Sequence, residues 1–516
     1  MADDNANYNM SIKNRIRTFE NQFSRISKSI EIYGRYNTWV HFECNGLVLD
    51  TANPKNKNLI LQTWEYNKNG SGTANNFTLR ICYNFSEASE MYNLPDIHYV
   101  EEALCLDKIV ENPDGSLAGF LSAADKLSCR FRYGYINVGS ESDQILSPEY
   151  EGQITGCTPE LRDNMLFYTI TGVSGVFGGK DAKFSFQKIE GWKATDLAWD
   201  VLNKYYGSGY ADNGLKYTIN KPYKIINKTA TSGIRTKERE QNFDPVNGDT
   251  VFGYVTRVLK SAKYHDEDEL SKIPDDEKPY CTFYVDDYEH AIVIDVVDPK
   301  NTINNGYYSN ENVSENDSTS NNSDSVNYDT SVVFEYPNKN QNFILSFTPS
   351  FDLKTVWSGV IYSDKNKARW GIDEGGNLLV AKNINESGFL TVTKTTDTTA
   401  VSGSVISSNG SGTNDTTSNG PNKENVPDSN TTKEDATAAS TFSEAVNQEY
   451  SATLSCLGIP ADIPIQTRLK IVPILNGSPY MFQGSYMVKT CSDRIDSSGF
   501  ITEMSLFRLK TNSTNK

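Results

Sequence analysis

The chain has 516 residues, of which 37% are hydrophobic and 22% charged, and its formal net charge is −17. This length predicts roughly three or four domains with enough apolar material for sizeable cores. The acidic balance argues against a general nucleic-acid binder, because phosphate contacts need a basic surface, and against docking on an anionic membrane. No apolar run approaches the roughly 18 residues of a membrane span, so no membrane insertion is expected.

The N-terminal segment predicts a helix rather than a targeting signal. It has no apolar core behind its charges, so it is not a secretory signal, and we expect synthesis in the cytoplasm. Within residues 11–30, one apolar stripe recurs at helical spacing, which predicts an amphipathic surface helix. Its members are Ile12, Ile16, Phe19, Phe23, Ile26 and Ile30. This helix either packs on its own domain or docks onto a neighbouring subunit.

The segment that follows reads as antiparallel β-structure. Apolar residues alternate with polar ones from Val40 to Cys44, and Asn45-Gly46 is a signal for a two-residue hairpin turn. Alternation recurs over residues 77–83, which predicts a half-buried strand with one wet face. Residues 165–171 form a strongly β segment that follows the Asp163-Asn164 turn.

The pattern changes near residue 192 and predicts a mixed α/β region. Thr195 is a candidate helix cap before an apolar face, and Gly207 is a natural stop. A second helix is expected over residues 249–263. Two apolar runs, 282–285 and 291–297, predict a hairpin around Asp286-Asp287.

Two stretches, 301–329 and 395–440, are dominated by Asn, Ser, Thr, Asp and Gly, so they cannot build a core and are expected to be linkers or surface loops. The predicted class is therefore α+β and predominantly β, with two antiparallel β domains flanking a mixed α/β domain. The expected boundaries are 1–191 for the first β domain, 192–300 for the mixed domain, 301–329 for a linker, 330–394 with 441–512 for the second β domain, and 395–440 for an insertion.

The residue types that carry catalysis are sparse, so we predict no enzyme. The four histidines are His41, His98, His265 and His290, none with a partner at helical spacing, and no nucleophile, phosphate-loop or dinucleotide motif is present. The acidic runs His265–Glu269 and Asp286-Asp287 are interpreted as solvated loops, because adjacent carboxylates cannot all face one ion. No catalytic, cofactor-binding or metal-binding residue is predicted, and no cofactor.

Eight cysteines are present, without a CxxC pair, and several sit in apolar runs. We interpret them as small buried hydrophobes rather than as a disulfide framework or metal site. They are Cys44, Cys82, Cys105, Cys129, Cys157, Cys281, Cys456 and Cys491.

Three segments resemble the hub proteins of tailed-phage baseplates and related contractile injection machines. Residues 149–155 with 163–172 are similar to paired strands that close the first tube-like domain of such hubs. Residues 341–349 resemble the first strand of the second tube-like domain. Residues 452–458, 484–488 and 497–502 resemble its final hairpin, a G-x-Y-x-V strand before a Ser-Gly-Phe turn.

The resemblance implies a structural virion protein, located in the tail baseplate. Two tube-like domains per subunit would give a homotrimer with pseudo-sixfold symmetry, joining a hexameric tail tube protein to a trimeric central spike and touching other baseplate proteins. DNA would pass through the lumen without specific binding, and an acidic wall would repel its phosphates.

Two alternatives stay open at this point. A β-rich receptor-binding or adhesion protein of the virion would share the aromatic and Thr/Asn content, but not helices in the middle of the chain. A tail-associated cell-wall hydrolase would depend on a single Cys, His or carboxylate.

Overall fold

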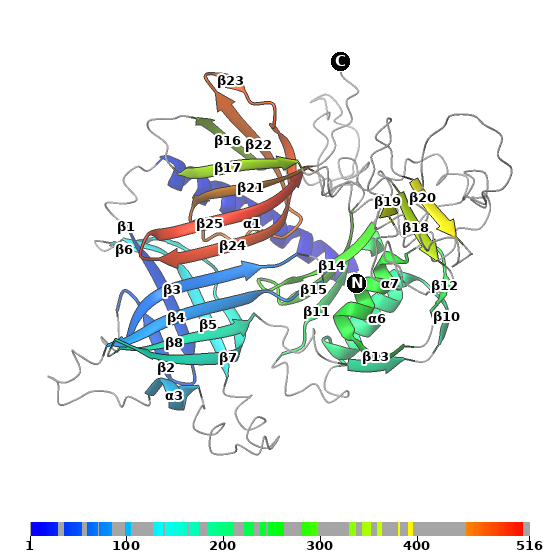
Figure 1. Cartoon of the computed structure of the whole chain (residues 1–516), viewed down its shortest axis with the longest axis horizontal. Coiled ribbons are helices and arrows are strands. Elements are labelled where there is room, and N and C mark those ends of the chain that lie inside the picture. The colour runs from blue at the N-terminus through cyan, green and yellow to red at the C-terminus, as the bar shows by residue number, and fades with distance from the viewer. Residues whose placement is uncertain are drawn as a thin grey trace.

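The computed structural model describes residues 2–28, 36–53, 59–70, 72–84, 99–104, 127–137, 140–163, 165–174, 183–186, 188–209, 221–231, 238–243, 246–262, 280–297, 330–336, 343–351, 359–363, 380–381, 391–395 and 450–508. The protein is predominantly β, as predicted, and it contains one large curled sheet and few helices (Figure 1). Within these ranges, no helix has both the length and the apolar character needed to cross a bilayer.

The helices fall at the N-terminus and in the middle of the chain. They are α1 (Ala2–Lys28), α3 (Tyr99–Ala103), α6 (Ala194–Tyr205), α7 (Val251–Lys260) and the 3-10 helix η4 (Lys228–Thr231). The strands before residue 200 are β1 (Tyr36–Cys44), β2 (Leu47–Asp50), β3 (Leu59–Lys68), β4 (Asn76–Asn84), β5 (Ser128–Asn137), β6 (Ser140–Leu146), β7 (Tyr150–Arg162), β8 (Met165–Val173), β9 (Lys183–Phe186) and β10 (Ile189–Trp192).

The remaining strands complete the sheets. Those of the middle region are β11 (Lys224–Asn227), β12 (Gln241–Phe243), β13 (Val246–Thr250), β14 (Tyr280–Asp286) and β15 (Ala291–Val297). Those after residue 300 are β16 (Thr330–Tyr336), β17 (Ile344–Phe351), β18 (Gly359–Ser363), β19 (Val380–Ala381), β20 (Thr391–Thr395), β21 (Tyr450–Leu457), β22 (Arg468–Leu475), β23 (Ser478–Pro479), β24 (Gly484–Asp496) and β25 (Gly499–Arg508).

The two helices of the middle region, α6 and α7, arise where their sequence patterns predict them, with one error in capping. Thr250 caps α7, because its hydroxyl accepts a hydrogen bond from the Gly253 N–H at 3.1 Å. Thr195 does not cap α6, contrary to the prediction. The Thr195 N–H donates to the Glu238 carboxylate at 3.0 Å, and the Thr195 hydroxyl also donates to it. Glu238, which lies outside the helix, therefore accepts the hydrogen bond of an N–H that has no partner within the helix.

The predicted turn between β1 and β2 is confirmed. Asn45 has a φ of 45° and Gly46 a φ of 88°. Positive φ at both central residues is the geometry of a two-residue hairpin turn that suits twisted strands.

Eleven strands of the large sheet follow one path, β17-β21-β25-β24-β3-β4-β8-β7-β5-β1-β2. Two groups of four strands along it have the same order in chain terms. In the first half-sheet, β3-β4-β8-β7, the strands lie first, second, fourth and third along the chain. The second half-sheet, β17-β21-β25-β24, repeats this order. The large sheet thus contains a duplicated four-stranded module.

The duplication extends to single residues in the hairpins β7–β8 and β24–β25. β7 and β24 each have 13 residues. The register shifts between Ile154 and Gly156 in the first hairpin, and between Val488 and Thr490 at the matching place in the second. Both hairpins close with a two-residue turn, after Arg162 ↔ Met165 and after Asp496 ↔ Gly499 respectively. This correspondence places Cys157 and Cys491 at equivalent positions.

The outer strands β3 and β17 also match. β3 shifts register against β4 between Leu61 and Thr63, and β17 shifts against β21 between Ile344 and Ser346. Bulges bend a strand and increase its twist. Equal bulges at equal positions therefore give the two half-sheets the same curl.

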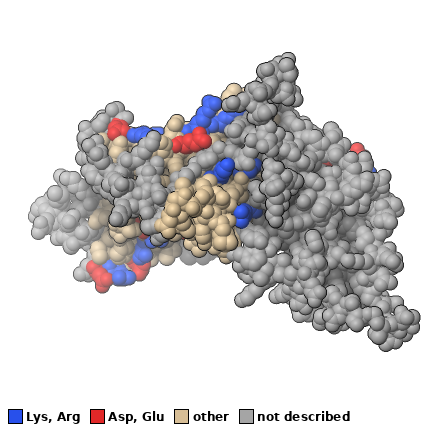
Figure 2. All heavy atoms as spheres, turned by 90° about the horizontal axis from the view of Figure 1, so that it is seen from above, with Lys and Arg blue, Asp and Glu red and all other residues tan. Residues whose placement is uncertain are grey.

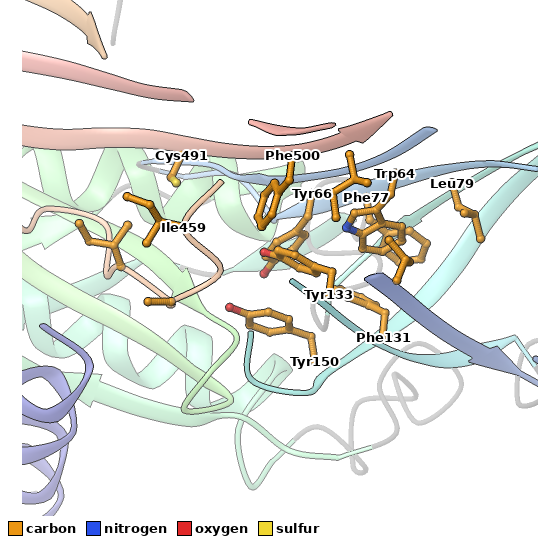
Figure 3. Packing of buried hydrophobic residues seen from close by; sticks show 14 of the residues in the cluster. Trp64, Tyr66, Phe77, Leu79, Phe131, Tyr133, Tyr150, Ile459, Cys491 and Phe500 are labelled. Carbon is orange, nitrogen blue, oxygen red and sulfur yellow. The ribbon is translucent and has the colours of Figure 1, made fainter. Parts of the chain in front are cut away.

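The two half-sheets join inside the chain where β24 pairs with β3, which we call the internal seam. It runs antiparallel from Cys491 ↔ Lys68 to Ile495 ↔ Trp64. Beneath it, aromatic rings from strands on both sides of the seam share one core (Figure 3). The ring centroids of Tyr133 and Phe500 are 5.8 Å apart in an edge-to-face arrangement, and those of Trp64 and Phe131 are 4.9 Å apart. The seam therefore lies over a continuous hydrophobic core.

Residues 183–297, called the insert below, stand between the two half-sheets in the chain. Helices α6 and α7 pack on the three-stranded sheet β11-β15-β14 and enclose a separate apolar core. The insert lies at one end of the large sheet (Figure 1). There the Gly72 N–H donates to the Phe283 carbonyl at 3.0 Å, and the Asn75 amide donates to Asp287 at 2.7 Å.

Candidate assembly surfaces

One face of the duplicated sheet is polar and open to solvent. Two rows of residues cross the strands on this face, in register and two residues apart. The first row is Ser455, Glu503, Ser492, Asn67 and Asn76; the second is Ile501, Arg494, Glu65, Thr78 and Thr171. All of them are partly or fully exposed. Because alternate residues of a strand point to opposite faces, the residues between these rows form the core.

The charges on this polar face are mixed rather than acidic. Arg494 lies directly opposite Glu65 across the internal seam, and Arg80 forms an ion pair with Glu160 at 3.1 Å. On the side seen in Figure 2, acidic and basic residues of the described chain likewise form small separate groups beside an uncharged area. The described residues of this face therefore carry charges of both signs, although the net charge of the chain is −17.

Among the described residues, two strands of the duplicated sheet have a side along which no other strand is paired. β5 pairs only with Tyr150–Gln153 of β7, so the outer side of residues 155–162 has no strand beside it in the described chain. The outer side of β17 is likewise an end of the sheet path. Leu161 on β7 is 74% exposed and Leu345 on β17 is 46% exposed. Exposed apolar residues on free edges are typical of surfaces that pair with another chain.

A cluster of buried charges ties helix α1 to the rest of the molecule. Asp462 lies in the segment between β21 and β22 and accepts a hydrogen bond from the Tyr150 hydroxyl at 2.7 Å. Its carboxylate pairs with Arg15 of α1 and lies 2.6 Å from the Lys68 Nζ. Burial alone would raise the pKa of Asp462, but the charges of Arg15 and Lys68 outweigh burial and hold this pKa well below its usual range.

The Arg15 guanidinium also reaches the insert. Its second ion pair is with Asp286, at 2.6 Å, and Asp286 accepts a hydrogen bond from Tyr8 of α1 at 2.5 Å. Neighbouring Asp287 accepts hydrogen bonds from Tyr66 at 2.6 Å and from Ser174. The interpretation of Asp286-Asp287 as a solvated loop is therefore wrong. The turn is packed against α1 and the first half-sheet, a tertiary contact that local acidity does not reveal.

These two carboxylates differ in their surroundings. Asp286 faces a guanidinium, whereas Asp287 has only neutral donors. Burial raises the pKa of Asp287 to about 7, and the hydrogen bonds from Ser174, Tyr66 and Asn75 only partly oppose this rise. Its Oδ1 is enclosed and has no hydrogen-bond partner in the described chain. Asp287 is thus a carboxyl group that titrates near neutral pH.

The described histidines form no catalytic pair. His41 Nδ1 lies 3.4 Å from Asp50, and His290 stacks on Tyr223 at 3.9 Å while its Nε2 contacts the Lys221 carbonyl. His98 and the run His265–Glu269 lie outside the described residues. Among those described, no three His, Cys, Asp or Glu side chains gather where they could hold a metal ion.

The predicted burial of the cysteines is confirmed for six of the seven that the structure describes. All are free thiols, and all are buried except the partly buried Cys157. Burial raises the pKa of the Cys157 thiol to about 11, so it is protonated at neutral pH. Cys105 lies outside the described residues.

No family model and no curated protein matches the sequence. Among solved structures, the chain is similar to the 43 kDa tail protein of prophage MuSo2 from Shewanella oneidensis, at 10% identity, with 91% of this chain and 98% of that chain covered and a TM-score of 0.45. A tail protein from Neisseria meningitidis MC58 is similar at 9% identity, with coverage of 92% and 97% and a TM-score of 0.44.

A third similar structure is the c3393 protein of E. coli, a component of the type VI secretion system that exhibits structural similarity to the T4 bacteriophage tail proteins gp27 and gp5. Its identity is 7%, its coverage 91% of this chain and 77% of that chain, and its TM-score 0.38. The first two of these structures are named as tail proteins, and the third is named as a secretion-system component. TM-scores below 0.5 transfer no residue role or subunit arrangement to this chain.

Proposed function

We propose that this protein is the structural hub of a phage tail baseplate: a homotrimeric ring that joins the hexameric tail tube to the central spike. The observation that carries the proposal is the duplicated four-stranded module fused into one curled sheet. Three copies of a subunit with two equivalent modules present six near-equivalent surfaces while obeying threefold closure. The division into two tube-like domains, 1–191 and 330–394 with 441–512, around a mixed α/β domain at 192–300, is part of this proposal.

The polar face of the sheet would line the channel of the ring. The opposite face carries the aromatic core, so it faces the body of the subunit. Short hydroxyl and amide side chains with paired charges offer DNA neither a basic surface nor an apolar one. The genome would pass along this wall without being held, through the absence of attraction rather than through acidic repulsion.

The two ends of the ring would meet partners of different symmetry. Features present in both modules occur six times in a trimer, and unique features occur three times. The equivalent turns at Arg162 ↔ Met165 and Asp496 ↔ Gly499 lie at one end of the sheet, and the insert lies at the other (Figure 1). We therefore place the hexameric tube protein at the turns and the threefold spike at the insert.

The mass of the purified protein in solution tests the trimer. We expect native mass spectrometry to give three times the 57.6 kDa of one chain. A single chain at every concentration up to tens of micromolar would contradict the proposal, because the open edges of the sheet would then need no neighbour.

The polarity has its own test, cross-linking to the tube protein of the same virion. A photoreactive probe on the exposed variant Ser497→Cys is expected to capture the tube protein, and the same probe on Glu240→Cys of the insert is expected not to. Capture at Glu240→Cys alone would reverse the assigned ends.

A further inference from the structure

The internal seam provides a template for the contact between subunits. In the path of the sheet, the third strand of the second module (β24) pairs with the first strand of the first module (β3). The same two kinds of strand lie at the outer borders of the duplicated modules: β7 is the third strand of the first module and β17 is the first strand of the second, and in the described chain residues 155–162 of β7 and the outer side of β17 have no strand beside them. A ring of equivalent modules repeats one kind of contact throughout.

We infer that the outer edge of β7 pairs with the outer edge of β17 of a second copy of this chain, in the register of the internal seam. This inference rests on the proposed function and names the residues of its subunit contact. Pair by pair, Ser492 ↔ Asn67 of the internal seam corresponds to Thr158 opposite the neighbour's Ser350. Ile495 ↔ Trp64 corresponds to Leu161 opposite Phe347.

The way each strand is shared supports this pairing. On the side of β24 away from β25, β22 pairs with residues Gly484 to Met487, and β3 pairs with the residues from Cys491 onward. Within β7, β5 takes the matching first residues, Tyr150–Gln153. The residues of β24 that pair with β3 therefore correspond to the residues of β7 that have no strand beside them in the described chain.

An apolar side chain marks the same position. Ile495 in the internal seam is 2% exposed, whereas its equivalent Leu161 is 74% exposed in the single subunit. Burying a leucine side chain against a neighbour stabilises an interface relative to leaving that side chain in water. Pairing with a neighbour would therefore bury Leu161 as pairing with β3 buries Ile495.

Prolines distinguish the two kinds of seam. In this register Pro159 lies opposite the neighbour's Pro349, where the internal seam has Asp493 ↔ Tyr66. Proline cannot donate a ladder hydrogen bond and occurs within sheets mainly on edge strands. The seam between subunits is therefore weaker at its middle than the internal one. The same prolines protect the free edges of a lone subunit from uncontrolled strand addition.

A disulfide in the inferred register tests the seam. In a Cys157→Ser background, the double variant Thr158→Cys/Ser350→Cys is oxidised and run on a denaturing gel without reductant. We expect covalent dimers and trimers but no larger species, since a closed ring of three ends the series. Each single cysteine variant is expected to remain unlinked.

The matched control moves one cysteine along β17. Thr158→Cys/Ser346→Cys places the second thiol four residues away, roughly 13 Å along the strand, too far for a disulfide. Linking in this control but not in the inferred pair would overturn the register. Linked species beyond the trimer would overturn the closed seam. A trimeric mass with no link in either variant would leave the hub proposal standing and reject this seam.

Discussion

Replacing Arg15 by alanine is expected to lower the free energy of unfolding by about 3–5 kcal/mol, because the change leaves buried carboxylates without their partner. Arg15 pairs with both Asp286 and Asp462, and all three side chains are at most 5% exposed. Asp462 would keep Lys68 and the Tyr150 hydroxyl, and Asp286 would keep only hydroxyl and backbone donors. Urea denaturation followed by tryptophan fluorescence measures the loss.

The control lies on the same helix. Arg25 of α1 pairs with Asp143 at 2.7 Å, but its side chain is 48% exposed and that of Asp143 is 41% exposed. Arg25→Ala is expected to cost less than about 1 kcal/mol, because water screens and replaces an exposed ion pair. Equal losses for the two variants would show that the buried cluster does not hold α1 to the sheet and the insert.

Local signals in the sequence identified many elements correctly. The Asn45-Gly46 turn and the helices at 194–205 and 251–260 follow from residue preferences and apolar spacing within one segment. The helix predicted over 11–30 begins in fact at Ala2 and is described to Lys28. The first turns of α1 have no apolar stripe. Tyr8 is buried there and donates a hydrogen bond to Asp286, a residue that is distant from it in the chain.

The candidate site could be predicted only in part. The resemblance selected residues that lie in β7, β8, β24 and β25, so it pointed to strands of the duplicated modules. It could not show that the two hairpins correspond residue by residue. In this correspondence their strands share one identical position, Cys157 and Cys491, and equal bulges are a property of strand pairing rather than of composition.

The buried charges were beyond any local reading of the chain. Asp462, Lys68 and Arg15 come from three distant segments, and each alone is an ordinary surface residue type. Their burial depends on the segment between β21 and β22 entering the core beneath the first half-sheet. Only the fold brings these groups within reach of one another.

Replacing Asp287 by asparagine is expected to flatten the dependence of stability on pH between about pH 4 and 7. The folded pKa of Asp287 is about 7, above its ordinary value of 3.8. In this window the folded protein holds a proton that the unfolded chain has released, so stability falls as pH rises. The loss is complete above pH 7 and amounts to at most about 4 kcal/mol.

Asparagine keeps the shape of the neutral carboxyl group and does not ionise, so the variant escapes this loss. The stability difference between variant and wild type should therefore grow in favour of the variant from pH 4 to 8, measured by urea denaturation at each pH. Asp143→Asn is the control. The hydrogen bond from Tyr36, then that from Asn137, lowers the pKa of the exposed Asp143, so above about pH 5 this group is ionised in both the folded and the unfolded state, and its replacement should leave the stability difference nearly constant. A stability difference between Asp287→Asn and wild type that stays constant across this range would mean that Asp287 is ionised in the folded protein. The turn of the insert would then be held to the first half-sheet by a charged group rather than a neutral one.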